Sequence, residues 1–227
     1  MMLLAIDTST ETAGLALLKD GNPVAEKNWQ CGQNHTVQLL PQLNDLLEKN
    51  GVNLQSVTGI VVARGPGSFN GLRVGLSTAK GFAFSLKIPI VGISTLEATA
   101  YQFATTGLPV RPVFGAGRGE IATASYQQEG HKWQQLAPEY LTTPEALIEE
   151  IQTKTLFCGE YVPVMAAELV KKLGSKAVIP AGEALIRRAV FLAELGEIRL
   201  KAGDIDNAAT LQPIYLRKPP ITERKHV

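Results

Sequence analysis

The chain has 227 residues, which is enough for one large domain or two small ones with a sizeable core. Its net charge is only +1, so no overall field attracts nucleic acid or a membrane surface, and any RNA contact has to be local or supplied by a partner. No apolar run nears the ~18 residues of a bilayer-spanning helix, and the beginning of the chain lacks a signal-peptide pattern. We expect a cytoplasmic protein.

Short apolar runs and helical patterns alternate along the first hundred residues. Residues 2–6 and 13–18 are predicted to be two strands of a hairpin around a polar turn, and a third strand follows near residues 23–29. The next segment carries leucines at helical spacing and ends at Asn50-Gly51, which is a normal helix stop. The elements predicted after it are a buried strand at 58–63, an apolar helix at 72–86, a buried strand at 89–93 and a helix from Ser94 or Thr95 to about Ala104.

The second part of the chain repeats the layout of the first. Residues 111–130, like residues 3–21, combine an apolar strand, a small polar turn, an alternating strand and a turn that ends in glycine. The order β-β-β-α-β-α-β-α, which occurs twice, predicts an α/β protein with the two-lobed actin-like ATPase (ribonuclease H-like) fold. Alternation alone would also permit a generic doubly wound fold. The later helices are predicted near residues 145–151, 164–174 and 183–196, and the later strands near 155–159 and 176–180.

These patterns divide the chain into three segments. Residues 1–105 are predicted to form an N-terminal lobe with partner-binding helices, residues 106–210 a smaller C-terminal lobe, and residues 211–227 a C-terminal segment with a basic tail. The basic residues of that segment are Arg217, Lys218, Arg224 and Lys225. A solvated terminus is a better interpretation of them than an RNA contact.

The sequence lacks the common patterns for metal binding and nucleophilic catalysis. Its histidines, His35, His131 and His226, are scattered, with no HxxxH or HExxH spacing, so we expect no metal site. No GxSxG motif offers a serine nucleophile. The two cysteines, Cys31 and Cys158, have no CxxC spacing and are interpreted as buried thiols. We therefore assign no catalytic residue.

The turn Asp7-Thr8-Ser9, after the first strand, is the candidate nucleotide site. A carboxylate can hold Mg²⁺ or its waters, while hydroxyls and turn N–H groups bind phosphate oxygens. An Asx-type turn that closes a hairpin is the structural alternative. A two-sided phosphate clamp needs a second acidic hairpin, yet the repeat places Gly115 opposite Asp7. We expect a reduced site that does not hydrolyse nucleotide unaided, with no cofactor of its own beyond weak binding of ATP or ADP with Mg²⁺ in a complex.

Residues 63–75, ARGPGSFNGLRVG, form a glycine-rich stretch between a predicted strand and a predicted helix. Its spacing fits neither the Walker A motif nor GxGxxG. Pro66-Gly67 is a turn dipeptide, and Ser68 can cap the helix that follows and leave N–H groups free there. A tight turn is one interpretation. Because three glycines exceed what a turn requires, close approach to a ligand or partner is the other, with Gly65, Gly67 and Ser68 as candidate phosphate contacts.

The two helices on either side of the glycine stretch carry more apolar surface than one sheet covers. Wider coverage indicates a second partner, which is either another helix of the same chain or another subunit. Small side chains in the second helix would let such a partner approach closely. The residues predicted to form an interface with another subunit are Leu39, Leu43, Leu47, Leu72, Arg73, Leu76, Ala79, Phe82 and Ala83.

Several motifs together resemble the TsaB (YeaZ) family of the actin-like ATPase (ASKHA) superfamily. They are LLAIDTST, HTVQLLP, VARGPGSFNGLRVG, PIVGISTLEA and IYLRKPP. The match covers most of residues 3–100 and residues 214–217, whereas residues 106–210 match in layout only. Where the family usually has an acidic residue in the second hairpin, this chain has Gly115, and Glu120 keeps the following acidic position.

The resemblance implies a non-catalytic accessory subunit for making threonylcarbamoyladenosine in tRNA, at the adenosine next to the anticodon. It implies a TsaD-type catalytic subunit bound through the N-terminal lobe, a TsaE-type ATPase, tRNA contacted mainly through the complex, and a second copy when the chain is alone. An autonomous actin-like ATPase or small-molecule kinase is the alternative, motivated by Asp7-Thr8-Ser9. A peptidase is a further alternative, which the missing metal ligands and nucleophile disfavour.

Overall fold

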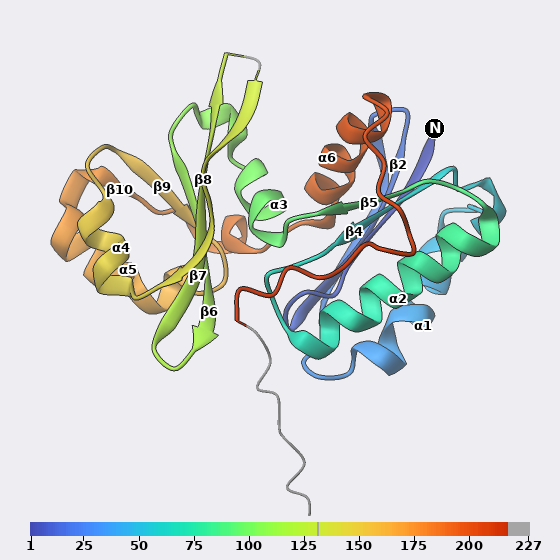
Figure 1. The fold of residues 1–227 in the computed structure, drawn as a ribbon, viewed down its shortest axis with the longest axis horizontal. Coiled ribbons are helices and arrows are strands. Elements are labelled where there is room, and N and C mark those ends of the chain that lie inside the picture. Colours follow the sequence, from blue (N-terminus) through green and yellow to red (C-terminus); the bar gives the residue numbers. More distant parts are fainter. Residues whose placement is uncertain (131, 218–227) are drawn as a thin grey trace, which may run out of the picture.

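The computed structural model describes residues 1–130 and 132–217 and has two five-stranded sheets, one in each lobe (Figure 1). The first half contains β1 (Met2–Asp7), β2 (Thr12–Lys19), β3 (Asn22–Gln30), α1 (His35–Lys49), β4 (Gly59–Ala63), α2 (Phe69–Leu86), β5 (Ile90–Ile93) and α3 (Thr95–Tyr101). The second half contains β6 (Val110–Gly117), β7 (Glu120–Glu129), β8 (Lys132–Thr142), α4 (Pro144–Glu150), β9 (Thr155–Cys158), α5 (Val162–Leu173), β10 (Ala177–Val178) and α6 (Ala189–Lys201).

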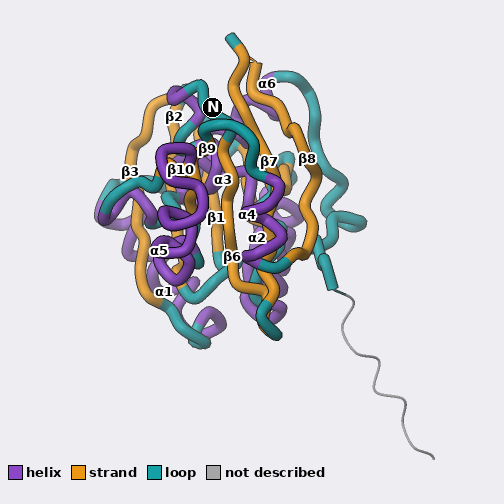
Figure 2. The backbone as a smooth tube through the Cα atoms, turned by 90° about the vertical axis from the view of Figure 1, so that its left-hand side faces the viewer, coloured by secondary structure: helices purple, strands orange, loops and turns teal. Residues whose placement is uncertain are grey.

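The two sheets have the same topology. Their strand orders are β3-β2-β1-β4-β5 and β8-β7-β6-β9-β10. In each sheet the first three strands form an antiparallel meander, and the remaining two lie parallel to the first strand. This confirms the two-lobed α/β fold with two related halves. The β7–β8 hairpin extends beyond the other strands in two views at right angles to each other (Figures 1 and 2).

The last helix of each half packs against the other half. Helix α3 lies against β6 and β7, and α6 lies against β1, β2, β4 and β5 of the first sheet. Both helices therefore sit between the two sheets (Figure 1). The two helices thus pack across the lobe boundaries at residues 105 and 210 that the sequence predicts. The physical reason is that each helix fills the gap between the sheets and covers the sheet across it.

Helix α6 also differs from its predicted bounds. It was expected to end at Gly196, but it begins at Ala189 and continues to Lys201. Gly196 lies inside the helix, where it packs directly on β4. A Cβ at this position would overlap the side chain of Val61. The glycine therefore allows close packing of α6 on the sheet, which outweighs its ~1 kcal/mol cost in helix propensity.

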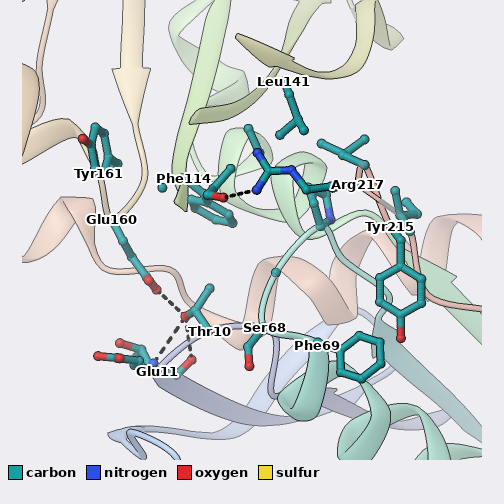
Figure 3. A pocket seen from close by; sticks show the side chains of 18 of the residues that line it. Thr10, Glu11, Ser68, Phe69, Phe114, Leu141, Glu160, Tyr161, Tyr215 and Arg217 are labelled. Atoms are coloured by element: carbon teal, nitrogen blue, oxygen red, sulfur yellow. Dashed lines mark hydrogen bonds between the residues drawn. The ribbon is translucent and has the colours of Figure 1, made fainter. Parts of the chain in front are cut away.

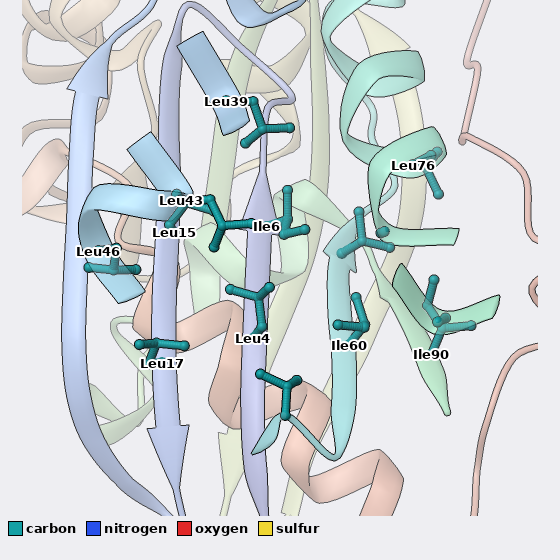
Figure 4. Close-up of a cluster of buried hydrophobic side chains, with 14 of the residues drawn as sticks. Leu4, Ile6, Leu15, Leu17, Leu39, Leu43, Leu46, Ile60, Leu76 and Ile90 are labelled. Carbon is teal, nitrogen blue, oxygen red and sulfur yellow. The ribbon is translucent and has the colours of Figure 1, made fainter. Parts of the chain in front are cut away.

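The outer face of the first sheet and helices α1 and α2 enclose one hydrophobic core (Figure 4). Leu4 and Ile6 of β1 meet Leu39 and Leu43 of α1 there, and Leu76 reaches the same cluster from α2. Each of these side chains is at most 4% exposed, so each contributes ~1.5–3 kcal/mol by burial. The alternating and helical apolar patterns are thus satisfied within the chain.

This core corrects most of the predicted interface. The buried members of that prediction are Leu39, Leu43, Leu47, Leu72, Leu76, Ala79 and Ala83. The chain's own sheet and helices cover most of their surface, and Leu43 and Leu47 reach the surface only in a groove that they line with Leu40 and Phe82. Phe82 is half-buried against the same core, and Arg73 is exposed. The large apolar side chains that remain exposed on the two helices are different ones: Val37, Leu40, Phe69 and Phe84.

The C-terminal segment runs back along the first lobe and then reaches the second. Asp206 pairs with Ile90 in an isolated antiparallel bridge, and Leu211 packs into the core of the first lobe. The Ile214 N–H donates to the Arg64 carbonyl at 2.6 Å, and Leu216 packs against the core of the second lobe. Of the predicted basic tail, residues 218–227 lie outside the described residues. Within residues 1–130 and 132–217, no helix is long and apolar enough to cross a membrane.

Candidate functional site

A cavity of about 910 Å³ lies where the two lobes and the C-terminal segment meet (Figure 3). The first lobe supplies the β1–β2 turn, the end of β3 and the start of α2, and the second lobe supplies β6, β7, β8 and the loop before α5. Its lining residues are Thr10, Glu11, Thr12, Gln30, Gln33, Pro66, Gly67, Ser68, Phe69, Phe114, Gly115, Ala116, Ala122, Leu141, Glu160, Tyr161, Ile214, Tyr215, Leu216 and Arg217. Ligand pockets in proteins commonly have this size and this interdomain position.

The predicted nucleotide residues divide between the cavity wall and the interior. Gly67 and Ser68 line the cavity, whereas Asp7, Thr8, Ser9 and Gly65 do not. Residues 7–9 are each at most 2% exposed. The turn that was expected to face phosphate is therefore buried behind the wall.

The glycines of residues 63–75 bring α2 onto the β1–β2 turn. A Cβ at Gly67 would overlap the Ser9 carbonyl oxygen, and a Cβ at Gly71 would overlap that of Thr8. Thr8 Oγ1 donates to the Gly71 carbonyl at 2.8 Å. The Ser68 N–H is likewise engaged, since it donates to the Ser9 carbonyl at 2.6 Å. The glycine stretch serves close packing between two parts of the same chain, and the Ser68 side chain caps α2 as predicted.

Asp7 and Arg187 form a buried ion pair behind the cavity wall. Asp7 is 2% exposed and Arg187 is 4% exposed, and Arg187 Nε donates to Asp7 Oδ2 at 2.5 Å. The other carboxylate oxygen, Oδ1, accepts hydrogen bonds from the Ser9 backbone N–H at 2.9 Å and from Ser9 Oγ at 2.6 Å. Both oxygens of Asp7 are thus engaged by the protein itself.

Arg187 also connects the two lobes. Its Nη1 donates to Glu160 Oε1 at 3.2 Å, and its Nη2 donates to Thr10 Oγ1 at 3.1 Å and to the Thr12 carbonyl at 3.0 Å. Thr10 Oγ1 in turn donates to Glu160 at 2.6 Å. Burial alone would lower the pKa of the Arg187 guanidinium, but the carboxylates of Asp7 and Glu160 outweigh it and raise the pKa. The guanidinium is therefore a fixed positive charge in the position next to the predicted metal-binding carboxylate.

These residues do not fit Mg²⁺ with a nucleoside triphosphate. Asp7 has no free oxygen for a metal or its waters, because Arg187 and Ser9 use both. On the opposite hairpin, Gly115 has no ligand to offer, and the Tyr161 ring lies 3.0 Å from where its Cβ would be. Among residues 1–130 and 132–217, no group of three or more His, Cys, Asp or Glu side chains is placed to hold a metal ion.

The C-terminal segment completes the cavity wall. Arg217 donates to the carboxylate of Glu120 and to the Ala116 carbonyl, both on the second hairpin. Tyr215 packs against Phe69 with ring centroids 5.4 Å apart, and the Arg73 guanidinium lies 3.9 Å from the Phe69 ring centroid. Glu120, which the sequence singled out as the remaining acidic position, thus holds Arg217 of the C-terminal segment.

Sequence reasoning did not identify Arg187, Glu160 or Tyr215 as site residues. Arg187 contacts a residue 180 positions away, and its neighbour Arg188 has the same chemistry but is exposed and pairs with Glu26. Nothing in the neighbouring sequence distinguishes Arg187 from Arg188. The one available signal was that their predicted helix contains two consecutive arginines within an otherwise apolar run.

Comparison with known proteins shows which family this chain resembles. Residues 29–201 match the family model described as TsaD, tRNA N6-adenosine threonylcarbamoyltransferase. The tRNA threonylcarbamoyladenosine biosynthesis protein TsaB of Bacillus subtilis (strain 168) is 34% identical over 220 residues, which cover 96% of this chain and 94% of that protein. The TsaB protein of Escherichia coli (strain K12) is 32% identical, over 96% of this chain and 95% of its own length. The chain belongs to the TsaB family.

A solved structure of the same family agrees with the whole architecture. YeaZ from Pseudomonas aeruginosa superposes with a TM-score of 0.78 at 26% sequence identity, and the match covers 94% of this chain and 100% of that one. The actin-like fold class predicted from the sequence is thereby confirmed. The interlobe cavity and its Arg187 ion pair are thus features of a TsaB-family chain.

Proposed function

We propose that this chain is an accessory subunit in the formation of threonylcarbamoyladenosine next to the anticodon of tRNA, working in the cytoplasm with a TsaD-type catalytic subunit and a TsaE-type ATPase. The observation that carries the proposal is its similarity, over nearly the full length of both chains, to proteins named for biosynthesis of this nucleoside. The match extends from one end of the fold to the other and includes both lobes, so it concerns the whole architecture.

The proposed role is non-catalytic, and the ion pair of Asp7 supports it. In an actin-like ATPase, a carboxylate at the end of the first strand would have to hold a metal or its waters, but here Arg187 and Ser9 use both of its oxygens. We further propose that the chain holds no ATP or ADP of its own. An autonomous ATPase or kinase requires a free carboxylate at this position, and a peptidase requires a metal or nucleophile that the described residues do not group together.

The outer surface of α1 and α2 is the proposed contact with the catalytic subunit. These helices pack on one face of the first sheet and leave large apolar side chains exposed on their outer side. Leu40 is 53% exposed and Phe84 is 84% exposed, while Gly81 has no atom within 4 Å of where its Cβ would be. Exposed apolar groups beside a glycine with open space around it favour docking of another helix pair. A second copy of the chain is proposed to use this surface when the catalytic subunit is absent, and tRNA is proposed to be contacted mainly through the complex.

Genetic replacement tests the proposed pathway. In a bacterium whose own TsaB protein has been depleted, expression of this chain should restore threonylcarbamoyladenosine in total tRNA, measured by mass spectrometry of the nucleosides. An unrelated folded protein expressed at the same level serves as the control. The proposed function is wrong if the chain is well expressed and folded, yet the modification stays absent and the growth and binding phenotypes of the depletion persist.

Co-purification with the TsaD-type subunit tests the proposed face. Phe84→Glu should weaken the pairing by at least about tenfold, because it places a charge in an apolar contact. Val164→Glu is the matched control, since Val164 is 70% exposed on α5 of the other lobe. If Phe84→Glu and Leu40→Glu both co-purify as fully as Val164→Glu, the contact lies elsewhere.

A further inference from the structure

The interlobe cavity has an aromatic lining that comes from three different parts of the chain. Phe69 starts α2, Phe114 and Tyr161 belong to the second lobe, and Tyr215 lies in the C-terminal segment. Figure 3 shows Phe114 and Tyr161 on one side of the cavity and Phe69 and Tyr215 on another. Aromatic faces attract apolar bodies and cations, because the ring quadrupole is negative above its plane. The lining thus suits a ligand that is apolar or positively charged.

Two of these rings already lie close to cations of the chain itself. The Arg73 guanidinium lies 3.9 Å from the Phe69 centroid, and the Arg187 guanidinium lies 5.6 Å from that of Phe114. Both distances are within the range of a cation–π interaction. Phe69 and Phe114 thus each already present a ring face to a positive charge of the chain itself.

The unpaired charge among the lining residues is negative. The lining residues Glu160 and Arg217 are paired with Arg187 and Glu120, respectively. Glu11 is the carboxylate that remains unpaired, since its side chain forms no hydrogen bond or ion pair with residues 1–130 or 132–217. A phosphate group would enter against this charge, whereas an ammonium group would be attracted by it.

We propose that the interlobe cavity binds a small organic cation with an aromatic or alkyl body, in place of the anionic nucleotide expected from the fold. Glu11 receives the cationic group, because Glu160 is already shared by Arg187 and Thr10. The body of the ligand lies among Phe114, Leu141 and Tyr215, which give the cavity its apolar wall. Arg187 closes the end at which a metal and phosphates would otherwise bind. The inference is independent of the proposed role in tRNA modification.

Calorimetric titration of the full chain with three probes tests this proposal. Tyramine is an aromatic ammonium cation, p-cresol is its neutral ring, and Mg²⁺ with ATP is the polyanion. Tyramine should bind with a millimolar or lower dissociation constant and about tenfold more tightly than p-cresol, because a charge-assisted contact contributes roughly 1.4 kcal/mol or more. Mg²⁺ with ATP should bind more weakly than either probe.

Two variants assign the binding to the cavity. Glu11→Gln should weaken tyramine about tenfold while leaving p-cresol unchanged, because only the charge is removed. Glu149→Gln, an exposed carboxylate on α4, is the control and should leave both probes unchanged. Tyr215→Leu should weaken both probes. The proposal is overturned if tyramine does not bind, if it binds no better than ATP with Mg²⁺, or if folded Glu11→Gln retains the affinity of the unchanged chain.

Discussion

The hairpin loops at the ends of β1 and β6 occupy equivalent places in two sheets of the same topology, but their chemistry differs. The first loop contains Asp7, whose carboxylate is buried and paired with Arg187, and the second contains Gly115, which has no side chain and lies against Tyr161. The shared strand order is therefore compatible with two different loops. A repeated architecture does not by itself make a two-sided nucleotide clamp, and here both loops serve contacts within the chain.

The outer helices of the two halves also differ, in this case in length. Helices α1 and α2 have 15 and 18 residues, while α4 and α5 have 7 and 12. The longer pair exposes Leu40 and Phe84, and the shorter pair exposes two valines, Val164 and Val170 on α5. The apolar groups exposed on the longer pair are larger, which fits its proposed role as the partner surface.

The largest expected effect comes from breaking the buried pair in the first loop. Asp7→Ala leaves the buried Arg187 guanidinium with the partly exposed Glu160 as its remaining carboxylate, so the free energy of unfolding should fall by about 3–5 kcal/mol. Urea denaturation of the purified variant measures it. Arg188→Ala is the control in the neighbouring residue, whose ion pair with Glu26 is more exposed and should contribute about 1 kcal/mol or less. Equal, small losses in both variants would show that the pair does not hold the loop.

A slightly smaller effect separates the inner and outer sides of α1. Leu39→Ala removes a side chain that is 1% exposed and should cost about 2–4 kcal/mol in the free energy of unfolding, because a cavity remains in the core. Leu40→Ala should cost less than about 0.5 kcal/mol, because its side chain is mostly in solvent. Chemical denaturation of the two variants side by side tests the assignment of the faces. The reverse order would contradict it.

Gly115→Asp places an acidic residue in the second loop, at the position equivalent to Asp7 in the first. Its Cβ would lie 3.0 Å from the Tyr161 ring, which has to move, so we expect a loss of about 1 kcal/mol in stability. ATP with Mg²⁺ should still not bind measurably in a calorimetric titration, since Asp7 stays paired with Arg187. Tight, magnesium-dependent binding by this single variant would mean that the missing carboxylate alone had disabled the site.

The smallest expected effect is a pH dependence of stability at α3, the helix of the first half that packs against the second sheet. Burial raises the pKa of the Glu97 carboxyl on α3, near Trp133, Glu139 and Arg199. A raised pKa in the folded state gives stability that is fully present below the unfolded pKa of about 4.3 and is lost as the pH rises through the folded value. Glu97→Gln should therefore raise the melting temperature at neutral pH and leave it nearly unchanged near pH 4. An equal change in melting temperature at both pH values would show that the buried charge of Glu97 is not the cause.

The fold followed from the sequence to a large extent, because short apolar runs and helical spacings report burial directly. The repeat of residues 3–21 in residues 111–130 correctly predicted two sheets of one topology. The exchange of α3 and α6 between the lobes was not predictable in this way. An apolar helix shows that one face is buried, but its pattern does not say which of two nearby sheets covers that face.

The site was harder to predict for the same reason. Helical spacing correctly marked Leu39, Leu43 and Leu76 as apolar-face residues, but it could not distinguish the chain's own sheet from another subunit. Asp7 was predicted as a nucleotide- or metal-binding carboxylate, whereas its observed partner Arg187 is 180 residues away and is decided only by tertiary packing. Long-range pairs of charges leave no local pattern in one sequence.

Reconstitution of threonylcarbamoyladenosine formation from purified proteins tests the central claim most directly. Unmodified tRNA, ATP and the precursors are supplied to this chain alone, to TsaD-type and TsaE-type proteins without it, and to all three together, and the modified nucleoside is measured by mass spectrometry. Product should form only when all three proteins are present. Product from this chain alone, or full product without it, would contradict its role as an accessory subunit.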